Sequence, residues 1–216
     1  MSTAIYFDLD GTLIDYDRPF EDIFYATVPE PHGESMFEDW QEHLLKNLTE
    51  MVPQPYFTAF ESICSQYDLD ISISQLTEEY INTEVNATQP VPQSQEILER
   101  LAKHHDIGIL TNGDHTVQQR KITAHGFDDI VDEVIISNEI GIRKPNPDIF
   151  KVAKRRLEAD NHLYIGDTVR EDIIPALNNG FHTIYIGNTE EEVPIQVKDL
   201  RAIADLLTII LSDNVP

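Results

Sequence analysis

The first residues of this chain that could do chemistry are two carboxylates one residue apart, Asp8 and Asp10, followed by Gly11. They come directly after the mostly apolar run of residues 4–7. A short apolar run bounded by turn residues is typical of a strand buried on both faces. Because strand side chains alternate, both carboxylates should emerge on the same side of the strand end, where open parallel sheets bind ligands. Carboxylates are costly in such a place unless cations or a metal ion balance them.

A second polar segment, Thr111-Asn112-Gly113-Asp114, follows the apolar run 106–110. A hydroxyl, an amide and a glycine at a strand end can offer side-chain and backbone donors to an anion. The same residues are also typical of an Asx-type turn before a helix, so this segment alone leaves both interpretations open.

Two more segments carry charged residues after apolar runs. Lys144 precedes two prolines in the segment 141–147, and a lysine held there could act as a compact charge on a phosphoryl group or be an ordinary surface residue. Asp167 follows the run 163–165 much as Asp8 follows its own strand. Asp172 lies five residues further on, near the start of a predicted helix, where the helix dipole alone would favour a carboxylate.

Hydrophobic periodicity predicts the elements that must position these side chains. Residues 18–88 have apolar residues at helical spacing and no convincing strand, which predicts an all-helical module. From Ser94, expected as a helix N-cap, helix and strand patterns alternate. Alternation of this kind predicts a parallel sheet with helices on both faces. The predicted strands are 106–110, 134–136, 163–165 and 183–186; the predicted helices are 95–104, 117–125, 147–157, 171–179 and 200–211.

The four polar segments, in this order, resemble the four signatures of the haloacid dehalogenase (HAD) superfamily of phosphatases. The motifs are DLDGTLID from Asp8, T-N-G from Thr111, K-P from Lys144, and G-D-x-x-x-x-D ending at Asp172. The resemblance covers residues 4–187, and the helical module resembles the inserted cap of the first HAD subclass. The T-N-G form, with Gln118, Gln119 and Lys121 downstream, looks most like the branch of small phosphatases such as pyrimidine 5′-nucleotidases and N-acylneuraminate-9-phosphatase.

The resemblance implies a fold and a division of the chain. The fold is α/β, a doubly wound parallel sheet (a Rossmann-like HAD core) with an inserted all-helical cap domain. The core comprises residues 1–17 and 89–216, and the cap comprises residues 18–88. The prolines and acidic residues at both edges of the module favour two tethers and a cap that can hinge over the site.

The resemblance also implies a Mg²⁺-dependent phosphatase that hydrolyses a small phosphate monoester. Asp8 is then the nucleophile that forms an aspartyl-phosphate, and Asp10 is the general acid and base. Thr111, Asn112 and Lys144 hold the phosphoryl oxygens. Mg²⁺ binds the Asp8 carboxylate, the Asp10 backbone carbonyl and Asp167, the oxygen ligands that a hard cation prefers. Asp172 orients Lys144 or a water on the metal.

Other activities share this scaffold. A 2-haloacid dehalogenase has the same fold and nucleophile, but in that family the carboxylate two residues later and the metal are absent, whereas Asp10 and Asp167 are present here. A phosphomutase of the beta-phosphoglucomutase type keeps both aspartates and the cap, so it stays an alternative. A non-catalytic binding protein is disfavoured by the complete set of polar residues. The substrate should be selected by the cap, and the motifs leave open whether Tyr16, Arg18 or Trp40 faces it.

Composition bounds the partners. The chain has 39 acidic and 15 basic residues, a net charge of −24 that argues against nucleic acid or an anionic membrane as a partner. We interpret this excess as that of a halophilic protein, because molar salt screens the repulsion within a few ångströms; the alternative is an unusually acidic protein from an ordinary cell. Cys64 is the only cysteine, falls in phase with neighbouring aromatic residues and is expected to be buried. No signal peptide or spanning segment is visible, so we expect a cytoplasmic protein; its oligomeric state cannot be inferred.

Overall fold

The computed structural model describes residues 2–30 and 35–203. Contacts divide the chain into two compact units. We call the first the sheet unit; it draws on residues 1–15, 90–112 and 125–216. We call the second the helical unit; it comprises residues 16–89 and 113–124. The sequence-based division assigned residues 113–124 to the core, whereas their contacts group them with the helical unit, because Val117 packs into its apolar core and Lys121 forms an ion pair with Glu84.

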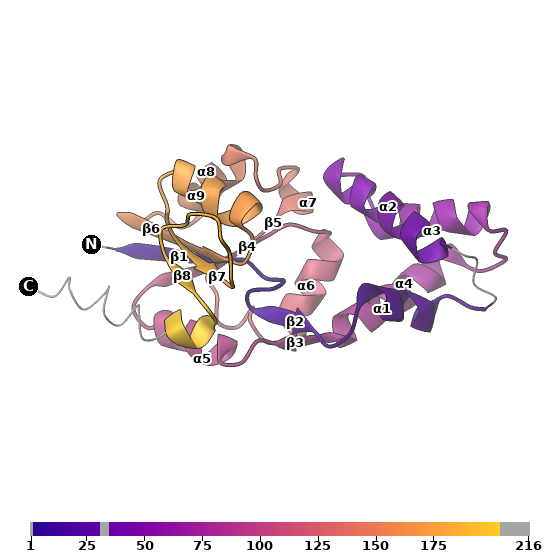
Figure 1. Cartoon of the computed structure of the whole chain (residues 1–216), viewed down its shortest axis with the longest axis horizontal. Helices are drawn as coiled ribbons and strands as arrows, with labels where there is room; N and C mark the ends of the chain where they lie inside the picture. Colours follow the sequence, from indigo (N-terminus) through magenta and orange to yellow (C-terminus); the bar gives the residue numbers. More distant parts are fainter. Residues whose placement is uncertain (1, 31–34, 204–216) are drawn as a thin grey trace, which may run out of the picture. The chain divides into compact units, whose positions relative to one another are not determined.

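The sheet unit is built on six strands in the order β5-β4-β1-β6-β7-β8, and every neighbouring pair is parallel. Helix α5 lies on one face of this sheet, and helices α8 and α9 lie on the other (Figure 1). The prediction of a doubly wound parallel sheet is therefore confirmed. The strands are β1 (Thr3–Phe7), β4 (Asp106–Thr111), β5 (Glu133–Ile136), β6 (Asn161–Gly166), β7 (His182–Ile186) and β8 (Gln196–Val197); the helices are α5 (Ser94–Leu101), α7 (Ser137–Ile140), α8 (Pro147–Arg156), the π-helical turn η1 (Val169–Ile173) and α9 (Ile174–Asn178).

Burial on both faces explains the apolar sequence of the central strand β1, whose residues 4–7 are completely buried. Its neighbours on the two sides are β4 and β6. Tyr6 of β1 and Tyr164 of β6 occupy paired positions and share one apolar cluster with Phe150 of α8 and Ala176 of α9. The sheet is thus anchored to the helices on the α8 face through aromatic side chains.

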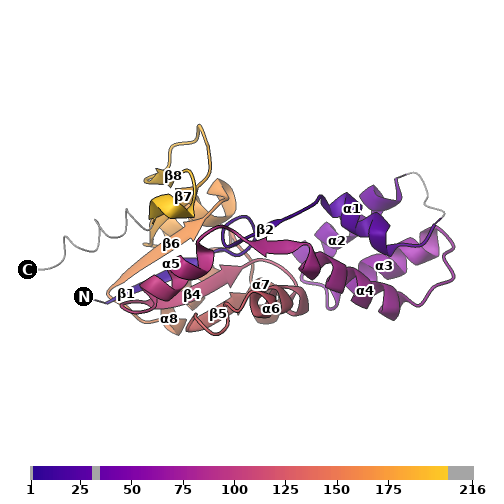
Figure 2. The ribbon, with the colours of Figure 1, turned by 90° about the horizontal axis from the view of Figure 1, so that it is seen from below.

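Over the described residues between 18 and 87, the structure has helices and no strand, as the spacing predicted (Figure 2). Aromatic rings fill the core of the helical unit: Trp40 lies 5.1 Å from Phe24, 5.4 Å from Phe60 and 4.7 Å from Tyr80, measured between ring centroids. Cys64 is buried in the same cluster. The helices are α1 (Phe20–Thr27), α2 (Met36–Thr49), α3 (Pro55–Gln66), α4 (Ile73–Asn86) and α6 (His115–Ala124).

Some local structure differs from the prediction. Strands β2 (Ile14–Tyr16) and β3 (Thr88–Pro90) pair in a small second sheet that apolar periodicity did not reveal, because each has only three residues. Helix α5 begins at Ser94 itself and is preceded by Gln93 in a left-handed conformation, so Ser94 is not the N-cap. Residues 200–203 are helical, and the rest of the predicted final helix lies outside the described residues.

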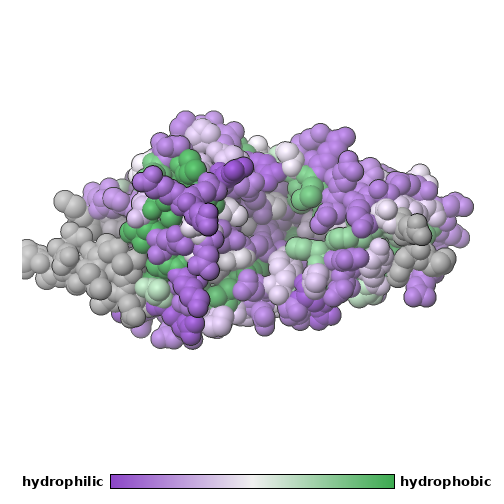
Figure 3. Space-filling view, viewed as in Figure 1, coloured by the Kyte–Doolittle hydropathy of each residue, from purple (hydrophilic) through white to green (hydrophobic). Residues whose placement is uncertain are grey.

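Hydrophilic residues predominate over the face shown in Figure 3, in keeping with the acidic composition. Within residues 2–30 and 35–203, none of the helices has both the length and the apolar character needed to cross a membrane.

Candidate active site

Topology brings the predicted site residues to one edge of the sheet. Asp8 directly follows β1, Thr111 ends β4, and Asp167 directly follows β6. Because β1 lies between β4 and β6 and all three are parallel, their carboxyl ends share one edge. Lys144 reaches the same place from the loop between α7 and α8. This edge is where open α/β sheets bind their ligands.

The Lys144 ammonium is the centre of the cluster. Its Nζ lies 2.8 Å from Asp8 Oδ1, 2.7 Å from Asp172 Oδ1 and 2.9 Å from the Tyr164 hydroxyl. An ammonium has three hydrogens to donate, so these three acceptors account for all of them. Lys144 and Asp172 are almost completely buried, with side-chain exposures of 2% and 0%. A buried charge of this kind holds one position only while its partners remain.

Asp172 is held by hydrogen bonds to both of its oxygens. Oδ1 accepts from Lys144 and lies 3.1 Å from the Tyr164 hydroxyl. Oδ2 accepts from the backbone N–H and the hydroxyl of Thr168. The π-helical turn η1 carries Asp172 back toward β6, close to Gly166, where a Cβ would lie 2.7 Å from the carboxylate carbon. Gly166 therefore leaves the space that this carboxylate occupies.

Asn112 fixes the backbone of Lys144. Its side-chain oxygen accepts from the Lys144 N–H at 2.9 Å, and its amide donates to the Lys144 carbonyl at 3.0 Å and to Glu171 at 2.9 Å. The Thr111 hydroxyl is buried and donates to the Asn112 carbonyl at 3.2 Å. The Asn112 side chain at the end of β4 thus connects the α7–α8 loop, which carries Lys144, with η1.

The turn after β1 brings Asp167 against the chain. The Leu9 carbonyl accepts from the N–H groups of Leu13 and Ile14, so the chain reverses tightly. Gly11 has a φ of +77°, and a Cβ there would lie 2.3 Å from Asp167 Oδ2. The Thr12 hydroxyl donates to Asp167 Oδ1 at 3.4 Å. Gly11 is therefore required twice, for its backbone conformation and for the close approach of the carboxylate.

Burial and charge set the protonation of the cluster. Burial, and next the Asp172 carboxylate, raise the pKa of Asp167 to about 6. Burial also raises the pKa of Asp8, although Lys144 opposes this shift. Burial lowers the pKa of Lys144, but Asp172 and Asp8 outweigh burial and raise it above its usual value, so the lysine keeps its charge.

The donor set fits a hard divalent cation. Single oxygens of Asp8, Asp167 and Asp172 all lie within 4.8 Å of one another. When ionised, three carboxylates beside one ammonium carry an excess of two negative charges. Carboxylate oxygens are the ligands that Mg²⁺ prefers, and a divalent ion would balance this excess. Because Asp172 already accepts hydrogen bonds on both oxygens, Asp8 and Asp167 are the better candidates for ligands.

The structure brings together five of the predicted residues, Asp8, Asn112, Lys144, Asp167 and Asp172, and places Thr111 beside Asn112. Asp10 is half-buried in the turn after β1. Two participants were missed. Thr12 belongs to the D-x-D-G-T motif and could have been found from it, whereas Tyr164 lies inside an apolar run and is typical of a core residue there.

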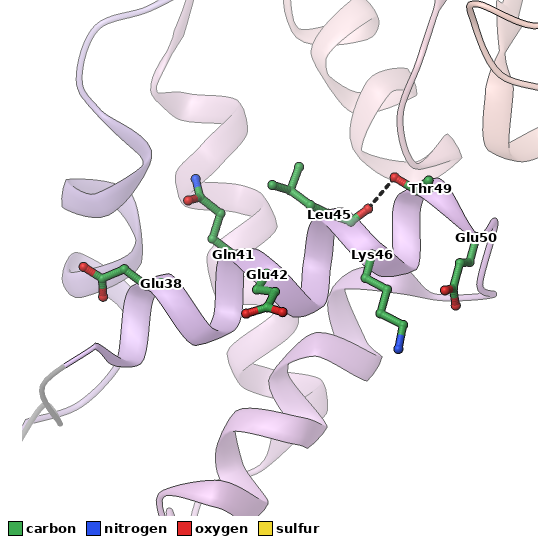
Figure 4. Close-up of a pocket in the computed structure, with 7 residues that line it drawn as sticks. All are labelled: Glu38, Gln41, Glu42, Leu45, Lys46, Thr49 and Glu50. Carbon is green, nitrogen blue, oxygen red and sulfur yellow. Dashed lines mark hydrogen bonds between the residues drawn. The ribbon is translucent and has the colours of Figure 1, made fainter.

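The helical unit holds none of these residues. Trp40, a candidate for contact with substrate, is buried in its aromatic core with 1% exposure. A shallow hollow runs along the outer face of α2 and is lined by charged and polar side chains that include Glu38, Glu42, Lys46 and Glu50 (Figure 4). It contains no residue of the predicted site.

Fold and cluster together define an α/β enzyme with a carboxylate centre at the carboxyl edge of its sheet. The family model of the haloacid dehalogenase-like hydrolases matches residues 5–186, and the chain belongs to this family. The predictions of HAD membership and of a hydrolase are therefore confirmed.

Two curated relatives and one solved structure are among those most similar to the chain. Pyrimidine 5′-nucleotidase YjjG of Escherichia coli (strain K12) is 28% identical over 205 residues, 88% of each chain. Glyceraldehyde 3-phosphate phosphatase of Pyrococcus abyssi is 30% identical over 198 residues, which cover 86% of this chain and 81% of the relative. The magnesium-bound HAD-hydrolase YfnB of Bacillus subtilis shares the fold, with a TM-score of 0.72 at 17% identity over 96% of this chain and 99% of that one.

Proposed function

We propose that this chain is a Mg²⁺-dependent phosphatase that hydrolyses a small phosphate monoester through an aspartyl-phosphate on Asp8. The observation that carries the proposal is the position of Asp8, buried at the end of β1 with Lys144 Nζ 2.8 Å from its Oδ1 and Asp167 beside it. The ion pair restricts the orientation of this carboxylate, which favours its attack on a bound phosphoryl group.

The reaction takes place in two steps, and both occur at the same phosphorus atom. An Asp8 oxygen attacks phosphorus, the ester P–O bond breaks, and Asp10 gives its proton to the leaving oxygen. Asp10 is then a carboxylate and takes a proton from water, whose oxygen attacks the phosphorus of the aspartyl-phosphate. Inorganic phosphate leaves, and Asp8 and Asp10 return to their starting states.

The phosphoryl group would be held by residues at the end of β4 and in the loop between α7 and α8 that carries Lys144. The Thr111 hydroxyl and the Asn112 backbone N–H would donate to the equatorial oxygens, and the positive charge of Lys144 would offset the charge that the transition state spreads over them. Mg²⁺ would bind to the Asp8 carboxylate, the Asp10 backbone carbonyl and Asp167, and would supply positive charge to a phosphoryl oxygen. Because the carboxylates outnumber the lysine, we expect metal to be obligatory.

The relatives support phosphate esters as the substrate class. One is named for a pyrimidine nucleotide and the other for glyceraldehyde 3-phosphate, and both names denote hydrolysis of a phosphate monoester. Asp10, two residues after the nucleophile, adds a proton donor for an ester oxygen, which a halide leaving group does not need. These observations favour a small phosphorylated metabolite.

The test is hydrolysis of para-nitrophenyl phosphate in molar KCl, with Mg²⁺ and with EDTA, by the wild type and Asp8→Asn. Asp148→Asn is the matched control, because Asp148 is an exposed aspartate in the first turn of α8 with an ion pair of its own. We expect turnover that requires Mg²⁺, falls to the blank in Asp8→Asn and is unchanged in Asp148→Asn.

Other outcomes contradict the proposal in distinct ways. Turnover that persists in Asp8→Asn excludes the aspartyl-phosphate. Metal-independent halide release from 2-haloacids indicates a dehalogenase. Isomerisation of a sugar phosphate without release of inorganic phosphate indicates the mutase.

A further inference from the structure

Tyr164, a residue of strand β6, contacts both Lys144 and Asp172 through its hydroxyl. Its hydroxyl lies 2.9 Å from Lys144 Nζ, 3.0 Å from the Leu110 carbonyl and 3.1 Å from Asp172 Oδ1. Lys144 Nζ also lies 5.6 Å from the centroid of the phenol ring. The Tyr164 side chain is completely buried. A purely apolar ring at this position of β6 would fill the same space and make none of the three polar contacts.

The contacts of the hydroxyl are directional. Lys144 can only donate, so the phenol oxygen accepts from it. The single phenol hydrogen is then available to the Leu110 carbonyl or to Asp172. Through this one oxygen the lysine of the α7–α8 loop is tied to β4 and β6, the two strands that flank β1.

We infer that Tyr164 is a positioning residue, whose hydroxyl is the third acceptor that holds the Lys144 ammonium between Asp8 and Asp172. Without it, one hydrogen of a buried ammonium has no partner in the described surroundings, and the ammonium is free to turn or shift toward either carboxylate. Lys144 then no longer holds Asp8 in one arrangement, and its positive charge no longer has a fixed position beside the phosphoryl group. The catalytic consequence rests on the proposed function; the positional one does not.

The chain offers a matched control in Tyr6. It occupies the paired position on β1, lies in the same apolar cluster and is as completely buried as Tyr164. Its hydroxyl donates to the carbonyl of Ala153 in α8 at 2.9 Å. Tyr6→Phe and Tyr164→Phe each remove one buried hydroxyl that lies within hydrogen-bond distance of a backbone carbonyl. A merely structural role therefore predicts equal effects.

The first experiment is kinetic, with para-nitrophenyl phosphate and saturating Mg²⁺. We expect kcat of Tyr164→Phe to fall about 10- to 100-fold, with KM changed less than threefold, because misplaced catalytic groups weaken the transition state more than substrate binding. Tyr6→Phe should stay within threefold in both constants. Equal kcat values for the two variants would overturn the inference.

The second experiment does not depend on activity. The chain has seven lysines, and NMR of ¹⁵N-labelled side chains detects an ammonium whose hydrogens exchange slowly because all are bonded. Lys121 is also buried and ion-paired, so the Lys144 signal is identified by its loss in Lys144→Met. We expect that signal in the wild type and in Tyr6→Phe, and its absence in Tyr164→Phe. Absence of a Lys144 signal in the wild type would overturn the inference even if Tyr164→Phe fails to fold. A wild type without Asp8-dependent turnover would refute the proposed function alone, and the NMR result would still decide the role of Tyr164.

Discussion

Single glycines decide how closely the carboxylates of this site can approach the backbone. Gly11 has a φ of +77°, and a Cβ there would lie 2.3 Å from Asp167 Oδ2. Gly141 has nearly the same conformation, with a φ of +68°, but a Cβ there meets no atom of the described residues within 4 Å. Substitution at Gly141 therefore tests backbone strain alone, whereas substitution at Gly11 tests strain together with a steric clash against Asp167.

Gly11→Ala should therefore damage the site more than the fold. Both Gly11→Ala and Gly141→Ala should lose about 1–2 kcal/mol of stability from the left-handed backbone. Only Gly11→Ala should also lose Mg²⁺-dependent turnover, by about 100-fold, because Asp167 must move by an ångström or more. Thermal denaturation and para-nitrophenyl phosphate hydrolysis measure the two effects, and equal activity of the two variants would argue against this account.

The site residues that the sequence predicts are those at positions where a charged side chain is unexpected. Asp8 and Asp167 stand out because each comes shortly after an apolar run, and Lys144 stands out because two prolines follow it closely. Tyr164 does not stand out, because a tyrosine in a strand is ordinarily a core residue. Its contact with Lys144 depends on two segments 20 residues apart meeting in space, which periodicity cannot supply.

Helices α4 and α6 are joined by a buried ion pair, although 28 residues separate the end of one from the start of the other. Lys121 Nζ lies 2.9 Å from Glu84 Oε1, and the two side chains are 3% and 1% exposed. The Tyr16 hydroxyl contacts both. One residue earlier, Arg120 pairs with Glu78 across the same two helices, but both side chains are exposed. The chain thus contains a buried and an exposed version of one interaction.

The buried and the exposed ion pair should contribute differently to the free energy of unfolding. Lys121→Met should destabilise the helical unit by about 3–5 kcal/mol, because it leaves the Glu84 charge buried without its partner. Lys121→Met combined with Glu84→Met should recover most of that loss, while Arg120→Met should cost no more than about 1 kcal/mol. Urea unfolding followed by fluorescence reports this unit directly, since Trp40 is the only tryptophan and lies in its core. Equal losses for Lys121→Met and Arg120→Met would be inconsistent with the buried pair.

Most elements were predictable because their periodicity is long enough to be read. The helices of 36–49 and 55–66 carry three or more apolar turns, and strands β1 and β4 are nearly continuous apolar runs. Strands β2 and β3 could not be predicted, since three residues show no alternation. The grouping of α6 with the helical unit was also missed: its apolar positions fit either unit, and its partner Glu84 interrupts no apolar pattern.

Over the whole molecule, the acidic excess is the dominant electrostatic feature. The net charge is −24, and the outer face of α2 illustrates its distribution, with Glu38, Glu42 and Glu50 around one Lys46 (Figure 4). At physiological ionic strength charges interact over about 8 Å, whereas at 1 M salt the range is about 3 Å. Such repulsion disfavours the compact state until salt screens it.

We therefore expect the melting temperature to rise between 0.1 M and 2 M KCl, on the order of several degrees, because screening removes repulsion that the folded chain concentrates. Replacing Glu38, Glu42 and Glu50 by Gln keeps helix propensity and removes three charges. This variant should melt higher than the wild type in low salt and gain less from KCl, which separates screening from general salting-out. A melting temperature that stays flat or falls with KCl would refute the halophilic interpretation of the composition. A rise that is the same in the variant would place the effect of salt elsewhere than in these carboxylates.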